Sequence, residues 1–480
     1  MEKGKANEVN KTAMKAGIWY LVSEVLIRGV SFLSTPIFAR LLSQAVYGSV
    51  KTYESWLYLL TPILSIGIYN SIERAKFDFE EKYDEYVSSV VFGVVVLDLI
   101  LAGASVMFKR PLAMFLDCSE MLVPVVFLYT AFYTALLCVQ KRERQMLQYK
   151  KSVIISLLSS VIPVLISVIF VIVYQGRVTS DAMTDVRILS FYIPIIVLGA
   201  GVALLAFVRG KKLFNYSYWS YGIKFSAPFI FYSVSMQILN QSDKIMIQKI
   251  SGADKAGIYA VATTVVYIMD VLNNAVQGAW LPWMFENLNI KKNKEIQKVW
   301  TMMLAAMGGL TWLIVMAAPE LILFLGGKKY EVAVWLIPPM VTGSLVHFIS
   351  VGYTNVEKFY KKTGCAAMAS LVAMIVNLVL NYYFIHEYGY EAAAYTTATS
   401  YLISVLMHWL FMQKYEIENV LPVKNTFLII SGFVCLNLCS MNFYKAPFYI
   451  RWGVLFLAVG VVALKFRKVI FDLLNKKILK

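Results

Sequence analysis

Residues 31–50 read SFLSTPIFARLLSQAVYGSV, an apolar stretch long enough for a helix that nevertheless contains Arg40 and follows Arg28 closely. The composition of the whole chain sharpens this contrast, because 59% of its 480 residues are hydrophobic and only 15% are charged. A soluble chain carries charge on about a quarter of its residues. Together with a mean hydropathy of +0.64, the composition predicts an integral membrane protein.

Apolar runs of the length that crosses a bilayer, about 20 residues, recur along the chain. Because backbone cannot cross hydrocarbon except in helices or closed barrels, and long continuous runs exclude a barrel, we expect an all-α membrane protein with about 14 transmembrane helices. The first run is too long for a cleavable signal peptide. The expected spans are 17–40, 48–70, 87–108, 112–139, 152–174, 188–208, 224–248, 257–282, 299–325, 330–354, 365–385, 391–412, 426–443 and 448–464.

Lysine and arginine indicate the orientation of these spans. With a cytoplasmic N-terminus, 31 of the 45 Lys and Arg residues fall on the inner side, as the positive-inside rule requires. Both termini are therefore expected in the cytoplasm, in a bacterial plasma membrane. Basic loops facing an anionic leaflet explain the net charge of +16 without nucleic acid as a partner.

The chain contains an internal repeat. Shifted by 209 residues, the opening stretch aligns with SMQILNQSDKIMIQKISGADKAGIYAV (235–261), so that Gly48 falls on Gly257 and Arg40 on Lys249. Polar residues spaced 0, 4, 7 and 11 apart share one helix face, and both copies carry such a stripe. The stripes are Glu24, Arg28, Ser31 and Thr35, and Ser233, Gln237, Asn240 and Lys244.

This repeat predicts two six-helix lobes related by a pseudo-two-fold axis, followed by two further helices. The expected segments are a cytoplasmic N-terminus (1–16), an N-lobe (17–208), a cytoplasmic linker (209–223), a C-lobe (224–412), helices 13 and 14 (413–464) and a basic amphipathic cytoplasmic tail (465–480).

Two motifs resemble those of a known family. They are Pro36, Ala39, Arg40, Leu41, Leu42, Ser43, Tyr47 and Gly48, and, later, Ala227, Pro228, Ser242, Asp243, Lys244, Gly252, Gly257 and Tyr259. With some fourteen spans, the chain resembles the polysaccharide flippases of the multidrug/oligosaccharidyl-lipid/polysaccharide superfamily. The resemblance implies a secondary transporter that flips undecaprenyl-diphosphate-linked oligosaccharide repeat units by alternating access, alongside the glycan polymerase and glycosyltransferases of the same pathway.

Cations lie within or beside the first, second and seventh spans, as expected of a flippase for a diphosphate-linked substrate. Intramembrane charges are costly unless they face a water-filled cavity. The alternative for those near helix ends is snorkelling to the interface, and for Arg28 it is a structural ion pair with Glu24. The expected substrate-binding residues are Arg28, Arg40, Lys51, Gln237, Asn240, Lys244 and Lys249.

Carboxylates within spans are the candidates for coupling to H⁺ or Na⁺. They are Glu24, Glu54, Asp98, Asp243 and Asp270. Asn377 and Asn381 could bind sugar hydroxyls or pack helices together. The five cysteines and three histidines have no metal-ligand spacing, and there is no P-loop, so no cofactor is expected.

Two alternatives stay open. A multidrug or cation antiporter of the same superfamily would share the twelve-helix core but favour an acidic cleft. A membrane glycan polymerase would be an enzyme and would need a large outer loop, whereas the longest expected here, YQGRVTSDAMTDVR (174–187), is short. The sequence therefore favours a transporter and not an enzyme.

Overall fold

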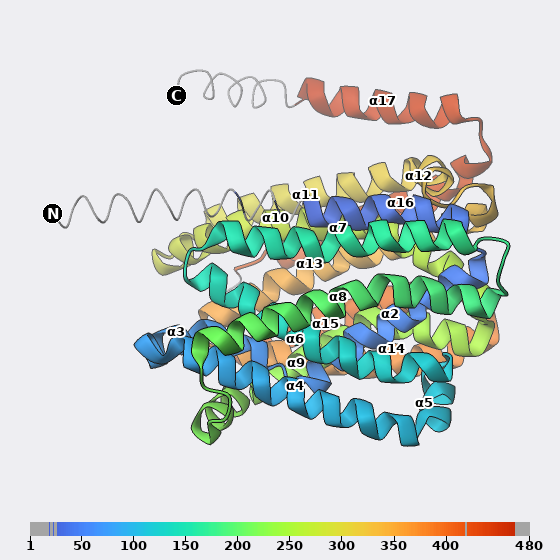
Figure 1. Ribbon diagram of the computed structural model, residues 1–480. Helices are drawn as coiled ribbons and strands as arrows, with labels where there is room; N and C mark the ends of the chain where they lie inside the picture. The colour runs from blue at the N-terminus through green and yellow to red at the C-terminus, as the bar shows by residue number, and fades with distance from the viewer. Residues whose placement is uncertain (1–18, 20–22, 24–25, 418–419, 466–480) are drawn as a thin grey trace. The chain divides into compact units, whose positions relative to one another are not determined.

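The computed structural model describes residues 19, 23, 26–417 and 420–465, and none of these forms a strand. Glu24, the segment 1–16 and the tail beyond Lys465 lie outside the described residues. The first half contains a helix over 26–41, α2 (Gln44–Leu64), α3 (Ile72–Phe79), α4 (Tyr83–Met107), α5 (Lys109–Leu116), α6 (Val123–Gln145), α7 (Tyr149–Tyr174), α8 (Ser180–Gly210) and α9 (Tyr216–Ser251), with the 3₁₀ turns η1 (Ile68–Asn70), η2 (Glu80–Lys82) and η3 (Glu120–Leu122) (Figure 1).

The second half is also helical. It contains α10 (Ala253–Asn289), α11 (Asn293–Met316), α12 (Ala318–Gly326), η4 (Lys328–Leu336), α13 (Ile337–Phe359), α14 (Thr363–Tyr388), α15 (Ala392–Lys414), α16 (Val423–Ser440), η5 (Met441–Lys445) and α17 (Phe448–Lys465).

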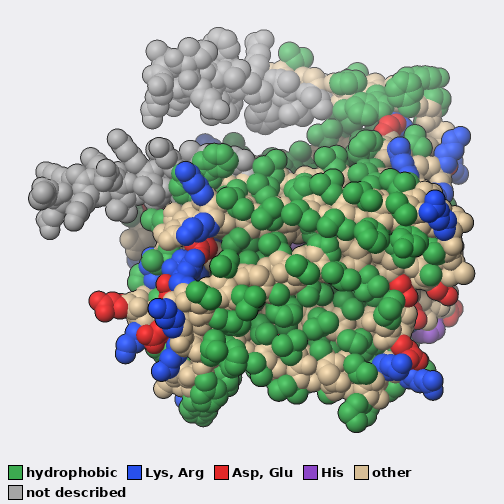
Figure 2. Space-filling model, in the orientation of Figure 1, with side chains coloured by type: hydrophobic (Ala, Val, Ile, Leu, Met, Phe, Trp, Pro, Cys, Tyr) green, Lys and Arg blue, Asp and Glu red, His purple; other side chains and the backbone are tan. Residues whose placement is uncertain are grey.

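Nine helices within the described residues are long and apolar enough to cross a membrane. The prediction of an all-α membrane protein is thus confirmed, while the number of about fourteen spans is not. Hydrophobic side chains cover the visible face of α7 and α8 in Figure 2, and many of them are exposed, such as Ile169 and Leu205. Lipid is the solvent that suits such a surface.

Two expected spans are divided. The run 112–139 is broken between α5 and α6, because Asp117 adopts a left-handed conformation with φ 54° and ends α5. Asp tolerates that conformation better than most residues, and the sequence Asp-Cys-Ser-Glu after Leu116 is a polar break within the expected span. The run 299–325 is divided in the same way, with α11 ending at Met316 and α12 beginning at Ala318.

The helices pack in two compact units, of which the first comprises residues up to Thr264, Leu325–Lys329 and Ala367–Thr396. In this unit α6 packs on α4 and α8, α7 packs on α8, and α2 packs on α9 (Figure 1). Three buried tyrosines form its centre: Tyr192 lies 6.0 Å from Tyr53 and 5.0 Å from Tyr129, ring centroid to centroid.

One end of the first unit is tied by ion pairs. Arg142 on α6 donates two hydrogen bonds to Asp84 on α4, at 2.8 and 3.0 Å. Glu143 accepts from Arg142 at 3.0 Å and from Arg209 on α8 at 2.7 Å. Residues 211–215 leave this end and lead into α9, whose first turn is capped by the side chain of Asn215.

The second unit comprises Val265–Phe324, Tyr330–Ala366 and the chain from Thr397 onward. Here α11 packs on α13 and α16. Trp300 is its central side chain: the indole stacks on Phe348 at 5.3 Å, covers Gly352 and donates to the Thr426 hydroxyl at 3.1 Å. The lobe boundaries expected from the repeat stay a prediction.

Candidate functional site

The helices that follow the two polar stripes along the chain, α2 and α10, cross closely in the first unit. A Cβ added to Gly48 on α2 would lie 1.8 Å from the carbonyl oxygen of Ala253, and one added to Gly257 on α10 would lie 2.2 Å from that of Gln44. Only glycine permits such an approach of two backbones. The start of α2 and the start of α10 are therefore in direct backbone contact.

One face of α2 beyond this crossing carries charge. Lys51 Nζ lies 2.7 Å from Glu54 Oε2, and the two side chains are 26% and 25% exposed. The Tyr58 hydroxyl donates to the other carboxylate oxygen of Glu54 at 3.3 Å, and Lys51 Nζ lies 5.8 Å from the ring centroid of Tyr47. These residues are three or four apart, so the helix places them on one face.

Lys244 on α9 adds a second cation to this face. The Thr52 hydroxyl donates to its backbone carbonyl at 3.4 Å, and the Ser55 hydroxyl donates to the side chain of Gln241 at 3.1 Å. These two bonds hold α9 against α2. Glu54 interacts electrostatically with Lys244 as well as with Lys51.

Arg187 on α8 supplies a third cation, and sequence reasoning missed it. Its guanidinium carbon lies 3.9 Å from the ring centroid of Phe38 and 4.6 Å from that of Phe191, and its charge also acts on Glu54. The residue had been assigned to an outer loop. The structure begins α8 at Ser180, after Thr179 caps it, which places Arg187 two turns into the helix; Thr-Ser-Asp at 179–181 is the start signal that would have revealed this.

We call Glu54, Lys51, Lys244 and Arg187 the Glu54 cluster. It has three positive charges and one negative charge, and hence an excess of two positive charges. Arg187 is 7% exposed, and its Nε and Nη1 have no hydrogen-bond partner among the described residues. Buried donors without an acceptor cost about 1–3 kcal/mol each. The cluster is therefore suited to an anion with several oxygen acceptors.

Two other predicted cations lie elsewhere. Lys249 is exposed and donates to the carbonyl of Phe115, the penultimate residue of α5, at 2.6 Å, with its Nζ 5.7 Å from the ring centroid of Trp56. Arg40 is exposed near the end of the helix over 26–41, and its carbonyl accepts from Lys329 at 3.3 Å.

The remaining predicted substrate-binding residues are Arg28, Gln237 and Asn240. Arg28 is partly buried in the helix over 26–41, Gln237 is partly buried on α9, and Asn240 is exposed on α9. The Arg28 pair with Glu24 falls outside the described residues. Of the seven residues expected to bind substrate, the structure thus brings Lys51 and Lys244 together.

Asp243, next to Lys244, lies in a buried polar network of the first unit. Its two carboxylate oxygens accept from the Tyr259 hydroxyl at 2.6 Å and from the Asn381 amide at 2.7 Å. Asn377 accepts from Ser242 and from Asn381, both at 3.1 Å. The two asparagines therefore connect α14 to α9, as expected if they pack helices together.

The other carboxylates differ in their surroundings. Asp98 on α4 is fully buried, and neither of its oxygens has a hydrogen-bond partner within the part of the chain that is described. An apolar site of this kind favours the neutral carboxylic acid. Asp270 on α10 is partly buried.

Comparisons with known proteins agree with this architecture. A family model described as "Polysaccharide biosynthesis protein" matches residues 13–288. An uncharacterized membrane protein of Haemophilus influenzae is 23% identical over 342 residues, which cover 67% of this chain and 79% of that protein.

Among solved structures, the lipid II flippase MurJ in an inward closed conformation matches with a TM-score of 0.72 and 15% identity, over 94% of this chain and 100% of its own. An inward-facing multidrug resistance MATE family transporter of the MOP superfamily matches with a TM-score of 0.59 and 10% identity, over 83% and 98% of the two chains. These likenesses show a shared transporter fold.

Proposed function

Because the chain belongs to the family of polysaccharide biosynthesis proteins, we propose that it flips undecaprenyl-diphosphate-linked oligosaccharide repeat units from the inner to the outer leaflet of the bacterial plasma membrane. The product would serve surface polysaccharide biosynthesis, with glycosyltransferases supplying the substrate and a glycan polymerase consuming it. The chain would lie in the membrane with both termini in the cytoplasm.

The observation that carries this proposal is the Glu54 cluster. A dianionic diphosphate would neutralise its excess of two positive charges. The Nε and Nη1 of Arg187 would find acceptors in phosphate oxygens, which match the planar guanidinium fork. Lys51 would release Glu54 and bind a phosphate oxygen of the substrate instead. Without substrate, the Glu54 carboxylate would take the place of the phosphate.

Movement of the substrate would follow alternating access between the predicted lobes, 17–208 and 224–412. Cations nearer to helix ends would meet the diphosphate as it enters or leaves. We assign this part to Arg40 and Lys249, a further contact with the diphosphate to Arg28, which lies inside the expected first span, and contacts with the sugar or the phosphates to Gln237 and Asn240.

Coupling to an H⁺ or Na⁺ gradient is assigned to Asp243. The carboxylate is buried, where it accepts hydrogen bonds from the Tyr259 hydroxyl and the Asn381 amide, and hard cations prefer oxygen ligands such as a carboxylate. A proton could occupy the same carboxylate. Asp98, Glu54, Asp270 and Glu24 are the other candidates.

The test uses bacteria that make a surface polysaccharide through this chain. Removing the chain is expected to stop export and to leave lipid-linked repeat units accessible only from the cytoplasmic leaflet. An antiporter of cationic drugs is the second candidate, because a multidrug transporter shares the fold. That candidate predicts normal polysaccharide export and increased sensitivity to cationic dyes in the same cells.

A further inference from the structure

A second buried ionisable group lies in the second unit, away from the residues used so far. His408 Nδ1 on α15 lies 2.7 Å from Glu357 Oε1 on α13, and each side chain is 1% exposed. The other carboxylate oxygen, Glu357 Oε2, is buried and has no hydrogen-bond partner within the described residues. Ionisable side chains inside a membrane bundle are costly and usually have a functional role.

The charge of this pair depends on a single proton. With a neutral imidazole and an ionised carboxylate the pair carries one negative charge, and with one more proton it is neutral overall. Burying an uncompensated charge costs several kcal/mol, whereas a hydrogen-bonded neutral pair avoids most of that cost. The site therefore has a physical reason to take up a proton.

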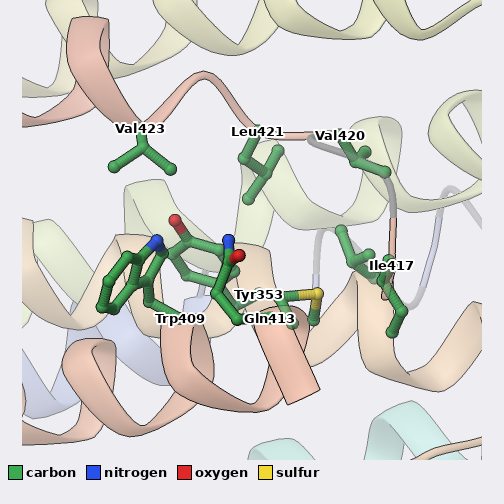
Figure 3. Close-up of a pocket in the computed structure, with 9 residues that line it drawn as sticks. Tyr353, Trp409, Gln413, Ile417, Val420, Leu421 and Val423 are labelled. Carbon is green, nitrogen blue, oxygen red and sulfur yellow. The ribbon is translucent and has the colours of Figure 1, made fainter. Parts of the chain in front are cut away.

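A small pocket with a mostly apolar lining lies near the pair. Its walls include Tyr353, one turn before Glu357, and Trp409, next to His408, together with Gln413. Figure 3 shows these three side chains close together, below Leu421 and Val423. The cavity of about 20 Å³ is large enough for one water molecule, which needs about 10–15 Å³ and two or more polar partners.

The pocket is joined to the pair by ring contact. The Tyr353 ring stacks on the His408 imidazole, with 6.2 Å between centroids and 8° between planes. Tyr353 thus contacts the imidazole with its ring and also lines the pocket. Lys358 lies in the last turn of α13, and Lys361 and Lys362 follow that helix, so the pocket lies toward the end of α13 that we expect to face the cytoplasm.

Other titratable groups surround the pair. His347, also on α13, interacts electrostatically with His408. Glu357, Lys362 and Lys414 act on the thiol of Cys365 at the start of α14. The neighbouring contact between α13 and α15 is the hydrogen bond of Ser350 with Ser404, 2.9 Å long, which does not titrate.

We propose that Glu357 and His408 form a proton-binding site that exchanges its proton with the cytoplasmic side through the pocket at Tyr353 and Gln413. The site binds one proton per chain, and its occupancy sets the pH dependence of transport. Proton binding stands on the geometry of the second unit alone. Its effect on transport rests on the proposed function.

The first experiment measures proton binding without any substrate. Purified full-length chain in weakly buffered detergent is titrated between pH 5 and pH 8, beside the double variant Glu357→Gln, His408→Gln. The wild type is expected to take up about one proton more than the double variant. The control, Ser350→Ala with Ser404→Ala, removes a hydrogen bond between the same helices and should titrate as the wild type does. Equal curves for wild type and double variant would overturn the proposal.

If the double variant does not fold, nuclear magnetic resonance of histidine-labelled wild-type chain replaces it. The chain has three histidines, so the signal of His408 can be assigned with the variants His347→Gln and His386→Gln. The His408 signal should shift with pH between 5 and 8. A signal that stays constant would show a permanently charged or neutral structural pair and would contradict the proposal.

The second experiment measures transport in vesicles as a function of internal pH. The wild-type rate should change at least several-fold between pH 5 and 8, and that change should be lost in the double variant. An unchanged pH profile together with a positive titration would refute the effect on transport only. If neither the wild type nor any variant flips the substrate, the proposed function is refuted, whereas the proton-binding site is not.

Discussion

Gly48 and Gly257 lie 209 residues apart in the chain and face each other across the crossing of α2 and α10. The crossing is reciprocal. Gly48 lies against the carbonyl of Ala253, four residues before Gly257, and Gly257 lies against the carbonyl of Gln44, four residues before Gly48. Gln44 and Ala253 are also 209 residues apart. The offset is the one that the internal repeat predicted from the sequence. The contact thus joins equivalent points of the two copies.

Replacing either glycine should damage the fold. Gly48→Ala places a methyl group 1.8 Å from a backbone carbonyl, and because backbone cannot move aside as a side chain can, we expect a loss of at least about 1–3 kcal/mol. Thermal unfolding of the purified chain measures it. Gly103→Ala on α4, where no atom lies within 4 Å of the added Cβ, is the matched control. Equal melting temperatures for both variants would contradict the crossing.

Arg187 should matter for transport more than for stability. If its buried donors bind phosphate oxygens, Arg187→Ala should lower flipping by about 10- to 100-fold, the equivalent of a charged hydrogen bond of about 1.5–3 kcal/mol. Arg187→Lys should recover only part, since it lacks the planar fork between Phe38 and Phe191. The exposed Arg177 serves as control, and Arg177→Ala should transport normally. A fall in protein abundance equal to the fall in transport would instead assign Arg187 a structural role.

Asp243→Asn should change the response of transport to ion gradients. The amide keeps the size of the carboxylate but cannot ionise, so flipping should become independent of the gradient, H⁺ or Na⁺, that drives the wild type. Transport into vesicles with each gradient imposed separately measures this. If the variant responds to both gradients as the wild type does, Asp243 is not the coupling residue.

The predicted orientation can be tested with reporter fusions. Fusions at Ser180 and Gly327 should report the outside, and fusions at Lys212, Lys292 and the C-terminus should report the cytoplasm, because Lys and Arg are concentrated on that side. A C-terminus on the outside would remove one span and contradict the division into lobes.

Sequence reasoning was most successful where the signal is carried by one helix or by a repeat. Apolar runs predicted the all-α membrane fold, and the 209-residue offset aligned Gly48 with Gly257, which the structure brings together at one crossing. The sequence of a single span does not reveal, however, which other helices that span packs against. Lys51 and Lys244 were both predicted, but their proximity to each other and to Arg187 depends on how α2, α8 and α9 pack.

The same limit explains the buried pair in the second unit. Glu357 and His408 are 51 residues apart; Glu357 follows the expected span 330–354, and His408 lies within the expected span 391–412. Only the packing of α13 against α15 brings their side chains within hydrogen-bond distance. Lys249 illustrates the opposite case, because this cation, which the repeat aligns with Arg40, bonds to the last turn of α5 instead.

Flipping by the purified chain in vesicles tests the central claim most directly. Vesicles would contain undecaprenyl-diphosphate-linked oligosaccharide with a labelled sugar, and a membrane-impermeant reagent would report how much label crosses the bilayer with time. We predict rapid crossing with the wild type, at least about tenfold slower crossing with Arg187→Ala, and normal crossing with Arg177→Ala. Crossing no faster than in protein-free vesicles, in a preparation that instead exports a cationic dye, would contradict the account.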